Sequence, residues 1–260
     1  MPLRLSIEFM VTKIVWKQEP DKLPKHQFAL AAFPGVGNVG KLLVDGVVEG
    51  LDSTLLANIY HPDMPPQAKI VDGILTPPHL SIHSVNLVDQ HILVIGGEGQ
   101  PLSTTGQYEV AETILDNATK LGCEYTLVLA GLASEPTCED VFAICADMEL
   151  KEIIEKEGGE VSADKPAGGV IGLAGLIASM GPVHGISSGC IVAATIGSSV
   201  DTLAAERMRV SLQDWLGVKI PIPIATTEQI ADKIEKLMDD YPDAQFPLEL
   251  EDDNASSLYA

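Results

Sequence analysis

The chain has 260 residues, of which 46% are hydrophobic and 20% are charged, and its formal net charge is −21 at pH 7. This composition predicts a folded globular protein with a large core. The acidic excess argues against nucleic acid as a partner, because phosphate neutralisation requires clustered lysine and arginine. The three arginines (Arg4, Arg207 and Arg209) are few for an enzyme acting on polyphosphate or carboxylate substrates. The acidic surface fits either a salty cytoplasm or a partner with a basic face.

Several absent patterns predict a cytoplasmic protein that spans no membrane. Glu8 and Lys13 interrupt the N-terminal apolar stretch, so we expect no signal peptide. No apolar run reaches the roughly eighteen residues that a membrane span requires. The cysteines form no Cys-x-x-Cys pair and have no histidine at metal-ligand spacing, so we expect reduced, buried thiols and no metal site. These cysteines are Cys123, Cys138, Cys145 and Cys190.

In chain order, the first predicted element is a half-exposed strand over 3–9, where apolar and polar residues alternate. After a proline-containing loop, the apolar run from Phe28 to Phe33 predicts a strand buried on both faces. Val39, Leu42 and Leu43 recur at helical spacing, so a helix follows. The tight glycine turn between strand and helix organises the rest of the chain.

Gly35, Gly37 and Gly40 in this turn match the G-x-G-x-x-G spacing of dinucleotide-binding loops. That fingerprint also requires an acid after the next strand, for which Asp63 and the neighbouring His61 are the candidates. The simpler interpretation is that the glycines let the helix pack close to the strand. We favour packing over cofactor binding.

The next segments predict strands with turns between them. Residues 54–60 form a strand, 68–75 a short strand with a turn at Asp72-Gly73, and 80–85 a second meander strand. Such short consecutive strands indicate an antiparallel addition to an otherwise parallel sheet. A buried strand over 91–95 then leads into a second glycine loop, 96–101.

The second half of the chain alternates helices and strands. Thr104 with Gln107 fits a capping box, which predicts the start of a helix that Gly122 ends. Ser198 or Ser199 is expected to cap a later helix, and Thr226 or Thr227 the last one. The remaining expected elements are strands over 126–130, 141–146 and 190–196 and helices over 148–157 and 170–180.

This alternation predicts an α/β fold: a mostly parallel sheet flanked by helices, with an added antiparallel meander. We see no internal repeat or linker, so we expect one domain over 1–241. Residues 242–260 are acidic, contain no lysine or arginine and have no regular period after Leu250, which predicts a flexible tail.

Three segments resemble the proteasome assembly chaperone family found in archaea and, more distantly, in eukaryotic assembly factors. They are FPGVGNVG over 33–40, GEGQP over 97–101 and GQYEVAE over 106–112. The resemblance implies a nucleoside-phosphorylase-like α/β fold and a homo-oligomer that works as an ATP-independent chaperone of proteasome α-subunits. It also implies that the protein is not an enzyme and has no cofactor or catalytic residues.

The last three residues, Leu258, Tyr259 and Ala260, resemble the hydrophobic–tyrosine–any (HbYX) C-terminus of proteasome activators. Leu258 supplies an apolar anchor and Tyr259 an aromatic body with a hydroxyl group. The carboxylate of Ala260 could pair with a lysine in the partner's pocket. These residues are therefore the predicted partner-binding site.

The alternative hypothesis is a small-ligand-binding protein or a nucleotide-processing enzyme that uses the two glycine loops. Both loops are expected at the carboxyl ends of strands, where α/β proteins bind ligands. Lys41 could meet a phosphate, although a lysine there is more often solvated. His184 and Ser187 are close in sequence but no acid completes a triad. The candidate cleft residues are Gly35, Gly37, Asn38, Gly40, Glu98 and Gln100.

Overall fold

A computed structural model describes residues 12–71, 73–88, 90–197, 200–222, 229–232 and 234–236. The strands are β1 (Lys13–Trp16), β2 (His26–Ala31), β3 (Asp52–Tyr60), β4 (Lys69–Val71), β5 (Ile74–Thr76), β6 (Leu80–Leu87), β7 (Gln90–Gly97), β8 (Tyr125–Ala133), β9 (Val141–Cys145) and β10 (Ser187–Thr195). The α-helices are α1 (Val39–Gly50), α2 (Thr104–Lys120), α3 (Met148–Lys156), α4 (Gly172–Met180) and α5 (Thr202–Leu216). Short 3-10 turns cover Pro20–Lys22, Val36–Asn38 and Gly181–His184.

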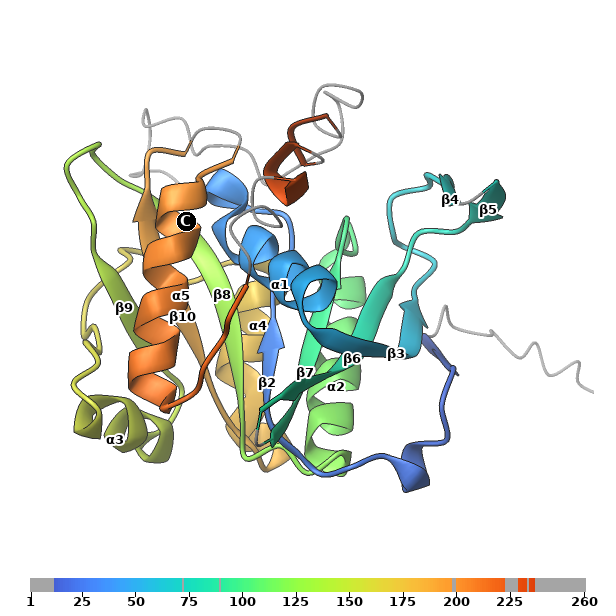
Figure 1. Cartoon of the computed structure of the whole chain (residues 1–260), viewed down its shortest axis with the longest axis horizontal. Helices are drawn as coiled ribbons and strands as arrows, with labels where there is room; N and C mark the ends of the chain where they lie inside the picture. The colour runs from blue at the N-terminus through green and yellow to red at the C-terminus, as the bar shows by residue number, and fades with distance from the viewer. Residues whose placement is uncertain are drawn as a thin grey trace, which may run out of the picture.

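Eight strands form one mixed sheet in the order β1-β3-β6-β7-β2-β8-β10-β9 (Figure 1). The four central strands β7, β2, β8 and β10 are parallel. On one side β6, β3 and β1 continue antiparallel, and on the other β9 is an antiparallel edge strand. The predicted fold class, with its antiparallel meander, is thus confirmed. The antiparallel direction of β9 was not predicted.

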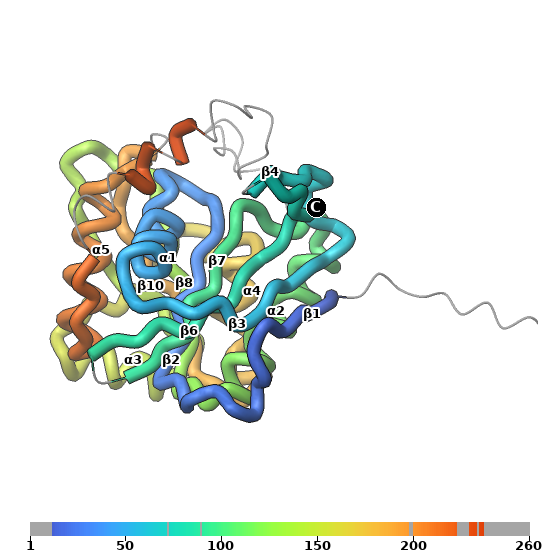
Figure 2. Tube along the Cα trace, turned by 45° about the vertical axis from the view of Figure 1, so that its right-hand side comes forward, coloured from blue at the N-terminus to red at the C-terminus, as the bar shows by residue number. Residues whose placement is uncertain are grey.

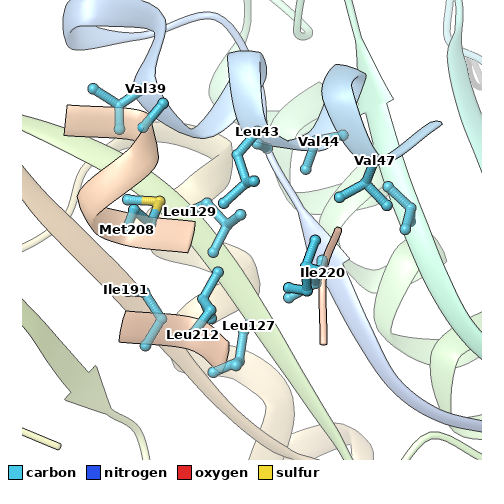
Figure 3. Packing of buried hydrophobic residues seen from close by; sticks show 14 of the residues in the cluster. Val39, Leu43, Val44, Val47, Leu127, Leu129, Ile191, Met208, Leu212 and Ile220 are labelled. Atoms are coloured by element: carbon cyan, nitrogen blue, oxygen red, sulfur yellow. The ribbon is translucent and has the colours of Figure 1, made fainter. Parts of the chain in front are cut away.

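Helices cover both faces of this sheet. Helices α1, α3 and α5 pack on one face, together with residues 229–232 and 234–236, while α2 and α4 pack on the other. The first core includes Val39, Leu43 and Val47 of α1, Leu129 of β8 and Met208 of α5 (Figure 3). The two layers follow from strands such as β2, which are apolar on both faces and bury every residue but one.

The β4–β5 hairpin stands apart from the body of the molecule at the carboxyl ends of the parallel strands (Figures 1 and 2). It is inserted between β3 and β6 and forms a separate two-stranded sheet. The predicted strand over 68–75 with a turn at its centre is therefore a hairpin.

Two predicted helix caps are wrong. The N-cap of α2 is Ser103, one residue before Thr104, and its Oγ accepts a hydrogen bond from the Gly106 N–H at 3.1 Å. The Gln107 side chain donates to the Pro101 carbonyl instead of completing a capping box. The N-cap of α5 is neither Ser198 nor Ser199 but Asp201, whose carboxylate accepts from the Ala204 N–H at 2.9 Å. In both helices the N-cap is the residue whose side-chain oxygen reaches a free N–H group of the first turn, and the sequence spacing alone does not identify it.

Other predictions lie outside the described residues. These are the strand over 3–9, the caps Thr226 and Thr227, and the tail. The boundary between a domain over 1–241 and a tail over 242–260 therefore stays a prediction.

Candidate functional site

The first glycine loop is packed tightly against the sheet. Gly37 and Asn38 have left-handed backbone angles (φ 61° and 46°), which turn the chain sharply from β2 into α1. A Cβ at Gly40 would overlap the backbone of Leu129 in β8, and one at Gly37 would lie 2.6 Å from the Thr195 hydroxyl. At Gly35 the nearest atom would be 3.8 Å away. Two of the three glycines are therefore required by close packing.

Residues of the chain itself fill the space beside this loop. The Asp201 N–H donates to the Gly37 carbonyl at 2.9 Å, and the Thr195 hydroxyl donates to the Asp201 carboxylate at 2.7 Å. Burial opposes ionisation of Asp201, but hydrogen bonds from Ala204 and Thr195 outweigh it and lower the pKa of its carboxyl. A carboxylate at this position disfavours a polyphosphate. The geometry favours the packing interpretation of the loop.

The second glycine loop borders a cavity of about 340 Å³. Its walls come from α1, from β6 and the end of β7, and from the β4–β5 hairpin with the proline-rich segments that flank it. Of the six predicted cleft residues, only Glu98 is among the residues that line it, and Gln100 lies instead near Gly172 at the start of α4. The structure thus does not gather these six residues at one place. A ligand cleft formed by them stays a prediction.

Ion pairs dominate the cavity. Lys41 Nζ lies 2.6 Å from the Asp45 carboxylate with only 7% of its side chain exposed, and Lys69 of the hairpin pairs with Glu98. Lys41 is thus neither solvated nor free for a phosphate. Burial raises the pKa of the Asp45 carboxyl; Lys41 opposes this rise, and repulsion from Glu49 and Glu98 adds to it. The cavity therefore contains opposed charges held close together.

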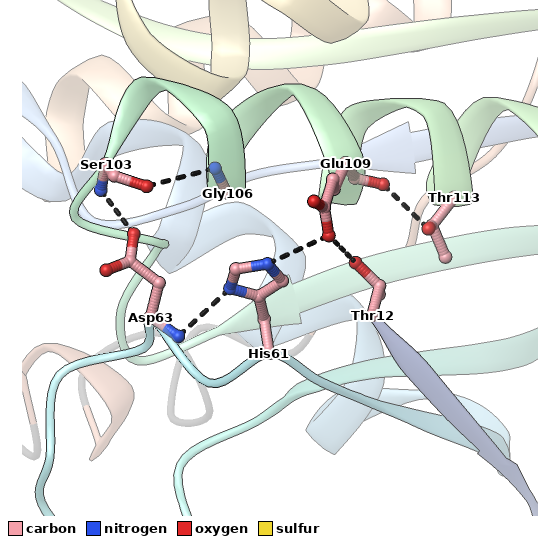
Figure 4. A network of polar contacts seen from close by, with 7 residues as sticks. All are labelled: Thr12, His61, Asp63, Ser103, Gly106, Glu109 and Thr113. Carbon is pink, nitrogen blue, oxygen red and sulfur yellow. Dashed lines mark hydrogen bonds and ion pairs between the residues drawn. The ribbon is translucent and has the colours of Figure 1, made fainter. Parts of the chain in front are cut away.

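A network of hydrogen bonds joins the segment after β3 to α2 (Figure 4). Asp63 accepts from the Ser103 N–H. Hydrogen bonds with the side chain and the backbone of Ser103 lower the pKa of the Asp63 carboxyl. The Asp63 N–H donates to His61 Nδ1 at 3.0 Å, so the proton of the neutral ring is on Nε2, which donates to Glu109 at 3.2 Å. Both nitrogens of His61 are therefore occupied. Asp63, a candidate for the acid of the dinucleotide-binding pattern, instead supports the first turn of α2.

The other candidate catalytic groups, His184 and Ser187, bind different partners. His184 Nδ1 lies 2.8 Å from the Asp116 carboxylate, whereas the Ser187 hydroxyl donates to Asp147 at 3.1 Å. The histidine and the serine thus have different acidic partners, and no triad joins them.

The four cysteines are free thiols, but only Cys123 and Cys190 are buried, so the expectation is wrong for the half-buried Cys138 and Cys145. Burial raises the pKa of the Cys123 and Cys190 thiols to about 12 and that of Cys145 to about 11. Within the described ranges, no three His, Cys, Asp or Glu side chains are arranged to hold a metal ion. None of the helices in this part of the chain is both long and apolar enough to cross a bilayer.

The model of the PAC2 family matches residues 29–241. The chain belongs to the PAC2 family. The family resemblance found in the three motifs is thereby confirmed. An uncharacterized protein from Methanocaldococcus jannaschii is 28% identical over 202 residues, which is 76% of this chain and 77% of that protein.

Solved structures share the PAC2 fold. PbaB from Pyrococcus furiosus, described as an archaeal proteasome activator, has a TM-score of 0.74 at 22% identity, covering 90% of this chain and 99% of that one. PbaA from the same organism, an archaeal homolog of proteasome-assembly chaperone, has a TM-score of 0.69 at 22% identity, covering 87% and 94%. A proteasome-assembly chaperone homologue from Mycobacterium tuberculosis has a TM-score of 0.62 at 17% identity, covering 84% and 97%. These similarities establish the PAC2 fold.

Sequence reasoning missed the cavity and the exposure of the hairpin. The ion pair of Lys41 with Asp45 has helical i, i+4 spacing, which was available as a pattern. The pair of Lys69 with Glu98 joins β4 to the loop after β7, 29 residues later, and no local sequence pattern predicts it.

Proposed function

We propose that this PAC2 protein is a proteasome assembly chaperone or activator that binds α-subunits or the core particle and is not an enzyme. The observation that carries the proposal is the whole-chain likeness to PbaB, which covers 90% of this chain and nearly all of that one. Family membership over 29–241 supports the same role. The occupied ring nitrogens of His61 and the buried ion pair of Lys41 also fit a protein without acid–base chemistry at these positions.

The proposed docking element is the C-terminal segment Leu258, Tyr259 and Ala260. An apolar side chain, an aromatic ring and a terminal carboxylate suit a pocket that offers apolar walls and a lysine. Homo-oligomerisation, which we also propose, would present several such segments to one ring. Binding would then gain strength through effective concentration without new contacts.

Co-purification with proteasome core particles from the same organism tests the proposal. The intact protein should be retained by immobilised particles, whereas deletion of 258–260 should abolish retention. Tyr259→Ala should weaken binding by about tenfold or more, since it removes an aromatic anchor.

Ser256→Ala is the matched control, because it changes the same segment without touching the three docking residues. It should bind like the unmodified protein. Equal retention of the intact and shortened proteins would refute docking by the tail, and absence of retention for the intact protein would refute the function.

A further inference from the structure

The β4–β5 hairpin exposes large apolar side chains. Ile70, Ile74 and Leu75 are 76%, 69% and 68% exposed, and Val71 is 53% exposed. These residues lie on two three-residue strands that project from the body in both views (Figures 1 and 2). Adjacent exposed apolar side chains on one element mark an interaction site, whereas single scattered ones do not.

The register of the hairpin separates its two faces. Ile70 lies directly opposite Leu75, and directly opposed residues share a face. Lys69, Val71 and Thr76 belong to the other face and line the cavity. The pair Ile70–Leu75 therefore points away from the cavity, and both faces of the hairpin carry exposed aliphatic groups.

The cavity at the base of the hairpin is lined by more acidic than basic side chains. Asp45, Glu49 and Glu98 line it together with Lys41 and Lys69, so it has one net negative charge when its histidines are neutral. The whole chain carries −21. At this surface a basic partner would be attracted more strongly than a second copy, whose own surface is acidic, so the proposed homo-oligomer would use another face.

We infer that the hairpin and this cavity form a second docking surface for a partner protein. The partner offers an apolar groove that is bordered by lysine or arginine side chains. The aliphatic pair Ile70–Leu75 enters the groove, and a basic side chain of the partner approaches Glu98. This inference rests on the proposed function, since the partner is the proteasome particle that the tail also binds.

The test measures binding of the full chain to core particles with the tail intact. The double variant Ile70→Ser, Leu75→Ser should weaken binding by about tenfold or more. Both side chains are mostly exposed, so the fold should persist. The matched control is Val88→Ser, Val183→Ser, because both valines are 83% exposed and lie in turns that precede β7 and β10, whereas the hairpin lies at the carboxyl ends of these strands. This control should bind within about twofold of the unmodified protein.

The charge component has its own control. Glu98→Gln should weaken binding more at low salt than at high salt, because screening already removes its contribution at high salt. Glu124→Gln, which changes a similarly exposed carboxylate paired with Lys25, should leave binding unchanged.

Photocrosslinking from position 74, with Ile74→p-benzoylphenylalanine, identifies the partner. A crosslink to a proteasome subunit is expected, and a crosslink only to a second copy of this chain would overturn the inference. If the unmodified protein binds but the hairpin variants bind equally well, this inference fails and the proposed function stands. If the unmodified protein does not bind, both fail.

Discussion

Gly40 and Gly35 belong to one loop but have different neighbours. The α carbon of Gly40 lies against the backbone of Leu129 in β8, so helix and strand approach without a side chain between them. Gly35 has an extended backbone and open space around its α carbon. A pattern of spaced glycines cannot distinguish these two cases, because the distinction depends on a strand about 90 residues later.

Gly40→Ala should therefore destabilise the protein by about 3 kcal/mol, since the added methyl group must displace backbone atoms. Gly35→Ala should change the free energy of unfolding by less than about 1 kcal/mol. Urea unfolding of both variants checks this. Similar losses at the two positions would show that packing does not explain the spacing.

His26 is a fully buried histidine at the start of β2. Its Nε2 lies 2.9 Å from the Ser84 hydroxyl, and its ring lies edge-on to His91 at 6.2 Å. Burial lowers its pKa, the nearby His91 lowers it further, and a hydrogen bond with the Leu121 backbone partly opposes the shift. Burial also lowers the pKa of His83.

Because the pKa of His26 is lower in the folded state than its ordinary value of 6.5, the unfolded chain takes up the proton first. The contribution of His26 to stability is therefore complete above pH 6.5 and is lost as the pH falls below it. Between pH 7.5 and pH 5.5, the free energy of unfolding measured in urea should fall less for His26→Gln than for the unmodified protein. His79→Gln, which changes a half-buried histidine, should retain the full loss; an equal loss in both variants would contradict this origin.

At the scale of elements, the start of α2 shows what a cap pattern can and cannot predict. Ser103, Thr104 and Thr105 are adjacent, and each has a suitable hydroxyl. The structure selects Ser103, because Asp63 from the segment after β3 binds the Ser103 N–H and fixes the entry of the chain (Figure 4). The deciding contact comes from 40 residues away.

Ser103→Ala should cost about 1 kcal/mol of stability, because one N–H of the first turn loses its acceptor. Thr104→Ala, at an exposed helical position, should cost less than about 0.5 kcal/mol. Thermal unfolding monitored by circular dichroism measures both. A larger loss of stability for Thr104→Ala than for Ser103→Ala would instead support the capping box that the sequence spacing predicts.

Elements with a strong local pattern could be predicted from the sequence. The unit of β2, the glycine turn and α1 was found because an apolar run, a turn and a helical period follow one another directly. Strands β8 and β10 extend further than predicted, to nine residues each, because they pair with each other along their whole length. Element type thus follows from local periodicity, but length follows from the neighbouring strand.

At the scale of the molecule, the parallel centre could be predicted from alternation, but the strand order could not. Nothing in 141–145 distinguishes an antiparallel edge strand from another parallel one. The candidate site shows the same limit: the cavity combines α1, β6, β7 and the hairpin, whose contacts are far apart in sequence. The family motifs, by contrast, were recognisable because each is contiguous.

The position of β2 has a consequence for synthesis of the protein. This strand is complete at Ala31, but its two neighbours are β7, ending at Gly97, and β8, ending at Ala133. During translation, about a hundred further residues must leave the ribosome before both of its edges are paired. A strand that the folded protein buries almost completely thus waits about a hundred residues for its second neighbour, and this interval is when holdase chaperones would have the most to protect.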